Sequence, residues 1–108
     1  MREKEIEKIL VHEVRKHGGL SYKFTSPGNA GVPDRIIVLS SGAVIFAELK
    51  ASQGRPTRLQ QKQIDSLKAR RADVRLIRGL IGLSEFFVSQ GWWDSADRVE
   101  RLLVRGER

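Results

Sequence analysis

The chain has 108 residues, a length that fits one domain with a modest hydrophobic core. The longest apolar runs, residues 36–39 and 43–47, are far too short to span a bilayer, and the charged N-terminus is not typical of a secretory signal. The sequence has no cysteine, which excludes disulfides and thiolate metal sites and fits a reducing compartment. These features together predict a cytoplasmic protein.

The positive charge of the chain is unevenly distributed. The formal net charge is +7, and the segment from Lys50 to Arg78 carries nine basic and only two acidic residues, so it holds the whole excess. A segment of this kind favours a polyanionic partner, most often nucleic acid. Charge alone leaves open a solvated basic helix that binds nothing in particular.

The hydrophobic pattern predicts a single α/β domain. In chain order, it indicates a helix over residues 2–17, strands over 20–24, 35–39 and 43–50, a helix from about 57 to 71, a strand over 74–77, and short helices over 84–90 and 94–104. Gly18 and Gly19 end the first helix, and residues 40–42 form a tight turn between two strands. The expected order is therefore helix, three strands, helix, strand, with a helical C-terminal tail.

Charged side chains gather on the predicted hairpin of residues 35–50. Glu48 and Lys50 are two residues apart on a strand, so their side chains share one face. Asp34 opens the preceding strand directly after Pro33, which restricts the backbone there. Antiparallel pairing of the two strands is expected to bring Asp34 close to Glu48 and Lys50.

These residue types suit a metal-dependent phosphodiesterase site. Hard divalent cations such as Mg²⁺ take one or two carboxylates, with water and phosphate oxygens at the remaining positions. Asp34 and Glu48 would supply the carboxylates, and the backbone carbonyl of Leu49 a further oxygen. Lys50 would orient the attacking water or stabilise the charge of the transition state. Taken singly, each of these residues is more often an ordinary surface charge.

The motifs in order resemble one nuclease family. Residues 31–35 (Gly-Val-Pro-Asp-Arg), 46–50 (Phe-Ala-Glu-Leu-Lys) and 57–60 (Thr-Arg-Leu-Gln) are similar to the VRR-NUC family, the virus-type replication and repair nucleases of the PD-(D/E)XK superfamily. The likeness covers roughly residues 1–80, and residues 81–108 are expected to be a helical extension of the same domain. It implies a restriction-endonuclease-like fold and a Mg²⁺- or Mn²⁺-dependent cut in DNA.

The resemblance also implies two further site residues. The family carries a glutamate on its first helix that faces the metal. Glu7 fits that position best, and Glu3, one turn earlier, is the alternative. The family also carries a glutamine on the helix that follows the Glu-x-Lys strand, and Gln60 fits it. A glutamine there would bind a phosphate oxygen or a water on the metal.

The partner expected from charge and resemblance is DNA, either branched, such as a Holliday junction or flap, or duplex. Four basic residues are predicted to bind the DNA backbone: Arg55, Arg58, Lys62 and Lys23. Stand-alone relatives of this kind imply a homodimer acting in replication, repair or recombination in a bacterial or phage-infected cell. The alternative is a catalytically inactive module of the same fold that only binds nucleic acid. Trp92, Trp93 and the tail have no predicted role beyond packing or an interface.

Overall fold

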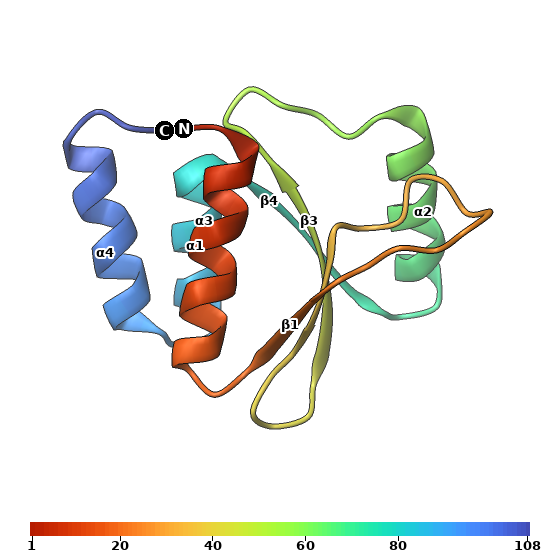
Figure 1. The fold of residues 1–108 in the computed structure, drawn as a ribbon, viewed down its shortest axis with the longest axis horizontal. Helices are drawn as coiled ribbons and strands as arrows, with labels where there is room; N and C mark the ends of the chain where they lie inside the picture. Colours follow the sequence, from red (N-terminus) through yellow and green to blue (C-terminus); the bar gives the residue numbers. More distant parts are fainter.

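A four-stranded mixed sheet forms the centre of the molecule, as seen in a computed structural model that describes residues 1–108. Strands β1 (Leu20–Lys23), β2 (Arg35–Val38) and β3 (Val44–Lys50) are antiparallel neighbours, and β4 (Asp73–Arg78) pairs in parallel with β3 at the far edge (Figure 1). A parallel neighbour requires a crossover connection, and here a helix provides it. The carboxyl ends of β3 and β4 therefore lie side by side.

Four helices surround the sheet in layers. Helices α1 (Glu3–Lys16) and α3 (Gly79–Ser89) cover one face, and α4 (Trp93–Val104) packs against α3 on the side away from the sheet (Figure 1). Helix α2 (Arg58–Ala69) is the crossover between β3 and β4 and lies on the opposite side, against β4. None of these helices is long and apolar enough to traverse a lipid bilayer.

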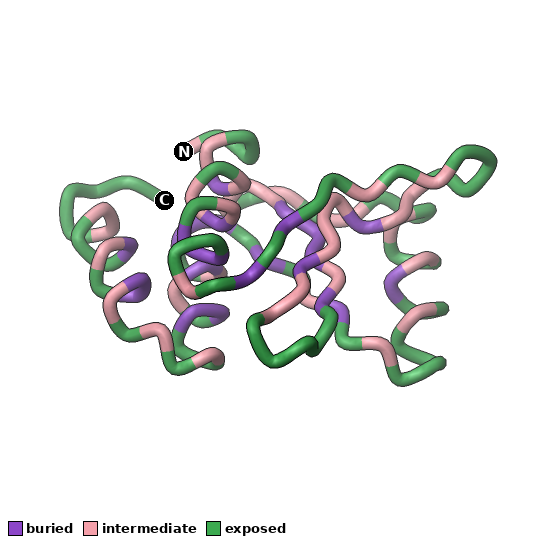
Figure 2. The backbone as a smooth tube through the Cα atoms, turned by 60° about the horizontal axis from the view of Figure 1, so that its bottom comes forward, coloured by how far each residue is buried: buried purple, intermediate pink, exposed green.

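The core lies between the sheet and the pair α1 and α3. Ile45, Ala47 and Leu49 alternate along β3 and are buried on the face that α1 covers with Ile6 and Leu10. Figure 2 shows buried segments, in purple, where the helices meet the sheet, while the turn between β2 and β3 is exposed. Glu48 and Lys50 alternate with these apolar residues, so their side chains point to the other face, toward α2.

The predicted order of elements is confirmed, with one boundary shifted by more than two residues. Helix α3 begins at Gly79, five residues before the expected start, because β4 passes into it without a loop. Gly79 makes this junction with a positive φ of 62°, and a Cβ there would lie 2.7 Å from the backbone oxygen of Arg108. Glycine tolerates both conditions, whereas other residues would be strained.

Residues 81–108 share the hydrophobic core of the domain. Leu83, Phe86 and Phe87 of α3 and Val99 of α4 belong to the same buried cluster as α1 and the sheet. The division at residue 80 marks where the family motifs end in the sequence, and as a domain feature it stays a prediction.

A cluster of charged side chains joins α1 to α4. Arg98 donates from Nε to Glu13 Oε2 at 2.9 Å and from Nη2 to Asp94 Oδ2 at 2.7 Å, and the Ser95 hydroxyl donates to Glu13 Oε1 at 2.6 Å. Hydrogen bonding to Arg98 is the main reason that the pKa of Glu13 is lowered and that of Asp94 falls to about 2. The buried Glu13 carboxylate is therefore fully paired.

Candidate active site

Asp34 lies at the start of β2 and is tied to β3 by its carboxylate. Its Oδ2 accepts a hydrogen bond of 2.8 Å from the backbone N–H of Leu49, and the other oxygen accepts none from the protein. This bond holds the Asp34 side chain against β3 at Leu49, the residue between Glu48 and Lys50, as the predicted hairpin pairing requires. One Asp34 oxygen is thus positioned by the backbone, while the other is available to a ligand.

Glu48 is completely buried, and neither of its carboxylate oxygens has a hydrogen-bond partner. The pKa of Glu48 is raised to about 7, mainly by burial and in addition by the negative charge of Asp34, while Lys50 opposes both effects. Buried polar groups are nearly always hydrogen-bonded, so two unpaired oxygens on one buried acid are unusual. Such a group suits a ligand that carries positive charge.

Lys50 shares a face with Glu48 and reaches back to it. Its Nζ lies 3.6 Å from Glu48 Oε2, and its side chain is only 12% exposed. An ammonium at this distance offsets part of the charge on Glu48 but leaves Nζ with donors for another group. Asp34, Glu48 and Lys50 therefore meet at one point where β2 starts and β3 ends.

A close approach of two backbones positions the loop before Asp34. Gly31 has a φ of 85°, and a Cβ on it would lie 2.7 Å from the backbone carbon of Leu59 in the first turn of α2. Only glycine fits such a contact and such a φ without strain. Gln63 adds a hydrogen bond of 3.3 Å from its Nε2 to the carbonyl of Ala30. The loop that carries Asp34 is therefore fastened to α2.

Gln60 is part of the helix cap of α2. Its Oε1 accepts from the backbone N–H of Thr57 at 2.9 Å, and its own N–H donates to Thr57 Oγ1 at 3.2 Å, which makes a reciprocal capping box. The oxygen is thereby engaged, while the amide Nε2 makes no hydrogen bond within the protein. Gln60 is thus set up as a donor.

The two candidate glutamates of α1 differ in their surroundings. Glu7 Oε2 accepts from Arg35 Nε at 2.7 Å, on the sheet face opposite Glu48, because Arg35 pairs in register with Ala47. Glu3 is the α1 carboxylate whose negative charge contributes to the raised pKa of Glu48. The structure thus brings Glu7 to Arg35 and leaves Glu3 without an ion pair.

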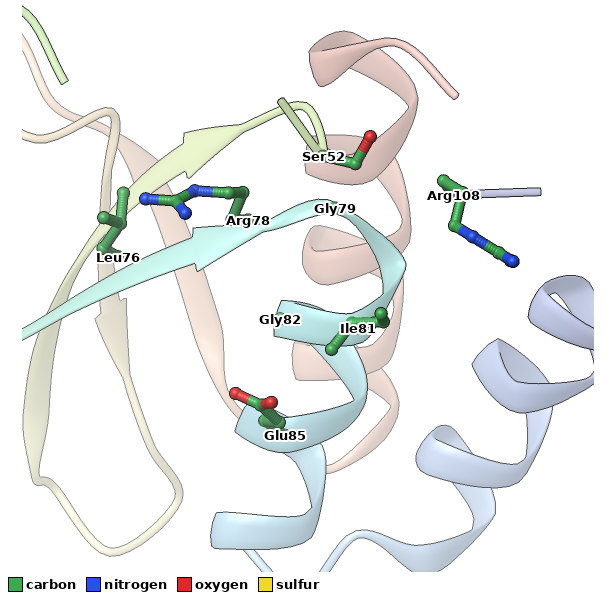
Figure 3. Close-up of a pocket in the computed structure, with 8 residues that line it drawn as sticks. All are labelled: Ser52, Leu76, Arg78, Gly79, Ile81, Gly82, Glu85 and Arg108. Carbon is green, nitrogen blue, oxygen red and sulfur yellow. The ribbon is translucent and has the colours of Figure 1, made fainter. Parts of the chain in front are cut away.

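Arg78 is a neighbour of Lys50 that the sequence analysis did not single out. The parallel register pairs Lys50 with Arg78, so both side chains leave the sheet on one face. Figure 3 shows the Arg78 side chain extending over β4 toward Leu76, at the edge of a pocket of about 400 Å³ between β4 and the start of α3. Arg78 is exposed and has no ion-pair partner. Its position beside Lys50 depends on the register between β3 and β4, which the sequence does not specify.

The predicted DNA-binding residues fall into two groups. Arg55, Arg58 and Lys62 are exposed on the loop after β3 and on the first turns of α2, and none makes an ion pair. Lys23 is exposed at the end of β1, and its register partner Arg35 faces α1. Lys23 therefore lies on the sheet face opposite Lys50.

Two clusters of acidic side chains are candidates for holding a metal. Glu13, His17 and Asp94 bring ligand atoms within 4.8 Å of one another, but Arg98 already neutralises both acids. Asp34 and Glu48, by contrast, keep free carboxylate oxygens, and Glu48 has no hydrogen bond at all. The oxygen donors that a hard divalent cation prefers are therefore available at the second cluster.

Comparisons with known proteins identify the family of the chain. The four-stranded mixed sheet flanked by helices has the fold of a PD-(D/E)XK-type nuclease domain. A phage protein, "Putative nuclease p44" of Acyrthosiphon pisum secondary endosymbiont phage 1, is 54% identical over 63 residues, which cover 58% of this chain and 68% of the relative. A solved structure described as "VRR_NUC domain" superposes with a TM-score of 0.67 at 22% identity, over 94% of this chain and 92% of the other. No family model matches the sequence. The chain belongs to the VRR-NUC family.

Proposed function

We propose that the chain is a metal-dependent nuclease that hydrolyses phosphodiester bonds in DNA. The observation that carries this proposal is Glu48, a fully buried carboxylate whose two oxygens lack partners, beside Asp34 and Lys50. Membership of the VRR-NUC family and the name of the phage relative support the same activity. An acid in this state is costly unless a cation binds it.

The residues take complementary roles in this proposal. Asp34, Glu48 and the backbone carbonyl of Leu49 would hold Mg²⁺ or Mn²⁺. When bound, such a cation supplies positive charge to the phosphate and a water of lowered pKa. Lys50 would donate from Nζ to the attacking oxygen or to the phosphate as negative charge develops there. The hydrogen bond from Leu49 N–H keeps Asp34 oriented during this step.

For the glutamate of α1, the ion pair that Glu7 forms with Arg35 favours Glu3. Glu7 is engaged by Arg35, and moving it to the site would leave that guanidinium without its partner. Glu3 has no ion pair and acts electrostatically on Glu48. We therefore propose Glu3 as the additional acid, which could position a water at the cation. An assay of Glu3→Gln against Glu7→Gln separates the two.

Around the cation site, donors are placed to bind phosphate oxygens. Gln60 has a free amide Nε2, which suits a phosphate oxygen better than a direct bond to a cation, because its Oε1 caps α2. Arg78 stands beside Lys50 and would contact the phosphate next to the cut. Arg55, Arg58 and Lys62 would bind the backbone further along the strand.

The finer features of the activity are also proposals. Resemblance to the family supports a branched substrate, such as a Holliday junction or flap, in replication, repair or recombination. The phage origin of the relative supports action in the cytoplasm of a bacterial or phage-infected cell. An exposed apolar patch on the sheet supports a homodimer: Leu20, Tyr22 and Val44 are each roughly half exposed on the face away from α1.

A cleavage assay tests the function. The wild-type protein and Lys50→Ala would be incubated with labelled four-way junction, flap and linear duplex in Mg²⁺, Mn²⁺ or EDTA. We expect the wild type to cut in the presence of metal, and the variant to lose at least a hundredfold in rate, as is usual for an electrostatic catalytic donor. Arg101→Ala, a substitution on the distant helix α4, is the control for general effects of lost charge.

Absence of metal-dependent cutting on every substrate would overturn the nuclease proposal. If DNA binding persisted in that case, the chain would instead be a nucleic-acid-binding module with a PD-(D/E)XK fold. A preference among the three substrates would decide whether branched DNA is the target.

A further inference from the structure

A second basic surface lies on the outer side of α1, away from the segment between Lys50 and Arg78. A groove of about 390 Å³ runs between α1 and the strands β1 and β2. Apart from Arg35, which pairs with Glu7, its lysines and arginines are Lys4, Lys8 and Arg15 from α1 and Lys23 from β1. Residues outside 50–78 carry no net charge in the sequence, because these cations are offset along the chain by acids that the fold directs elsewhere.

The positive charge of this groove is not neutralised within the protein. Lys4, Lys8, Arg15 and Lys23 are all exposed, and none of them forms an ion pair or a side-chain hydrogen bond. The single acid in the groove is Glu7, and it is already bound to Arg35 at 2.7 Å. Four free cations in one concave surface are suited to a polyanion rather than to a single acidic side chain.

The spacing of the cations follows one side of the helix. Lys4, Lys8 and Arg15 recur at intervals of four and seven residues, so they line up along α1 over roughly 16 Å at 1.5 Å per residue. Phosphates recur about every 3.4 Å along each strand of a duplex, so such a row could contact several of them. On α4, in contrast, Arg101 and Arg105 share their surface with Asp97 and Glu100.

The groove starts at the N-terminal end of α1, the end that carries Glu3. Lys4 follows Glu3, whose charge acts on Glu48, and Arg15 lies at the opposite end of the helix, near the start of β1 (Figure 1). A nucleic acid seated at Asp34 and Glu48 could therefore continue along α1. The groove lies on the other side of the sheet from α2, so it would hold a part of the substrate that Arg58 and Lys62 do not reach.

We propose that this groove binds the phosphate backbone of the DNA substrate beyond the cleavage site, through Lys4, Lys8, Arg15 and Lys23. The inference rests on the proposed function in that it takes DNA as the ligand. Contacts of this kind supply affinity and orientation without reading sequence. The groove would therefore hold the flanking duplex while the scissile phosphate occupies the site.

The experiment measures how DNA binding depends on salt. Binding of a labelled linear duplex would be followed by fluorescence anisotropy in EDTA over a range of NaCl concentrations. Lys8→Ala combined with Arg15→Ala removes two groove cations and leaves Lys4, next to the site, unchanged. We expect the slope of log K against log salt to fall in magnitude by about 2, one for each lost phosphate contact. Arg101→Ala combined with Arg105→Ala removes the same charge from α4 and should leave the slope almost unchanged.

The outcomes separate this proposal from the nuclease proposal. Three results would overturn the groove proposal. They are an unchanged slope in the Lys8 and Arg15 variant, an equal fall of the slope in the α4 control, and no binding of the duplex by the wild type. If the slope falls as expected but the wild type cuts no DNA, the groove stands and the nuclease proposal fails. If Lys50→Ala abolishes cutting while the groove variant keeps its slope, the nuclease proposal stands and the groove fails.

Discussion

Glu48 combines complete burial with two carboxylate oxygens that accept no hydrogen bond. An unsatisfied buried polar group usually costs the folded state about 1–3 kcal/mol, and more when it is charged. The neighbouring Lys50 at 3.6 Å offsets only part of this cost, since Asp34 adds negative charge. The metal-free protein therefore holds a locally unfavourable arrangement, as is common where residues serve a ligand rather than the fold.

Replacing this carboxylate with an amide is expected to stabilise the metal-free protein. Glu48→Gln keeps the shape and removes the buried charge, so its free energy of unfolding in EDTA should exceed that of the wild type by about 1 kcal/mol. Urea unfolding followed by circular dichroism measures this difference. Added Mn²⁺ should raise the melting temperature of the wild type and have much less effect on the variant.

The matched control is Glu85→Gln, an exposed acid on α3. It should change neither the stability in EDTA nor the response to Mn²⁺. A Glu48→Gln protein that is less stable than the wild type in EDTA would show that Glu48 is satisfied by the fold and not by a cation.

At the residue scale, the site residues that could be predicted to meet are those that lie close along the chain. The alternation of a strand places Glu48 and Lys50 on one face, and a tight turn brings Asp34 beside them, so their meeting could be predicted. The choice between Glu7 and Glu3 depends on how α1 is rotated against the sheet, so the sequence leaves it open. That rotation is set by the packing of Ile6 and Leu10 into the core, which no local pattern reports.

Helix α4 is held to α1 by the charged cluster around Arg98. Glu13 is buried, and Arg98 and Ser95 are its hydrogen-bond partners from α4. Bidentate pairs of arginine and carboxylate are strong when the geometry is this close. The apolar contacts of Val99 with the core complete the attachment.

Arg98→Ala is expected to lower stability at neutral pH and to flatten its dependence on pH in acid. The variant leaves the buried Glu13 without its charged partner, which should cost roughly 1–3 kcal/mol. The pKa of Asp94 is lowered from 3.8 to about 2, and that of Glu13 is lowered as well. Lowered carboxyl pKa values give stability that is present above the ordinary values and lost as pH falls through the folded values.

The wild-type and Arg98→Ala unfolding curves should therefore differ at neutral pH and converge as the pH approaches about 2. Thermal unfolding across that range provides the measurement, with Arg101→Ala as the exposed control on the same helix. A difference that stays constant down to low pH would mean that Arg98 acts through packing and not through the two carboxylates.

At the scale of the elements, the types of the helices and strands could be predicted from the sequence. Which residues of adjacent elements lie side by side could not. The start of α3 was predicted late because Gly79 and Gly82 interrupt its pattern, and glycine disfavours helix in the absence of tertiary contacts. Burial of Leu80 and Leu83 outweighs that preference. Arg78 was not predicted beside Lys50 because the register of a parallel pair depends on the crossover through α2.

Considered as a whole, the molecule leaves one side of its sheet partly uncovered. Helix α2 packs against β4, and Leu20, Tyr22 and Val44 on the β1 to β3 side remain 51%, 56% and 45% exposed. The surfaces that the sequence suggested for a dimer are mostly used within the chain, since Trp92 packs on His17 and Phe87 and α4 packs on α3. The exposed apolar sheet face is the better candidate for an interface.

The proposed homodimer can be tested through this face. Sedimentation equilibrium of the wild type should give twice the monomer mass of 12.2 kDa. Leu20→Glu combined with Val44→Glu places charge in the patch and should shift the protein toward monomer, because buried unpaired charges oppose association. Val88→Glu combined with Val104→Glu adds the same charge at other exposed sites and should leave the mass unchanged. A monomeric wild type, or equal dissociation in both variants, would contradict the sheet-face dimer.

Helix α1 has a different task on each of its sides. One side fills the core with Ile6 and Leu10, one directs Lys8 and Arg15 into the groove, and one carries Glu13 to α4. Because each added residue turns a helix by about 100°, a single insertion within α1 would rotate every later side chain away from its present contacts. Evolutionary drift of this family should therefore proceed by substitution in α1, while changes of length accumulate elsewhere, as at Gly42, where the turn has open space around it.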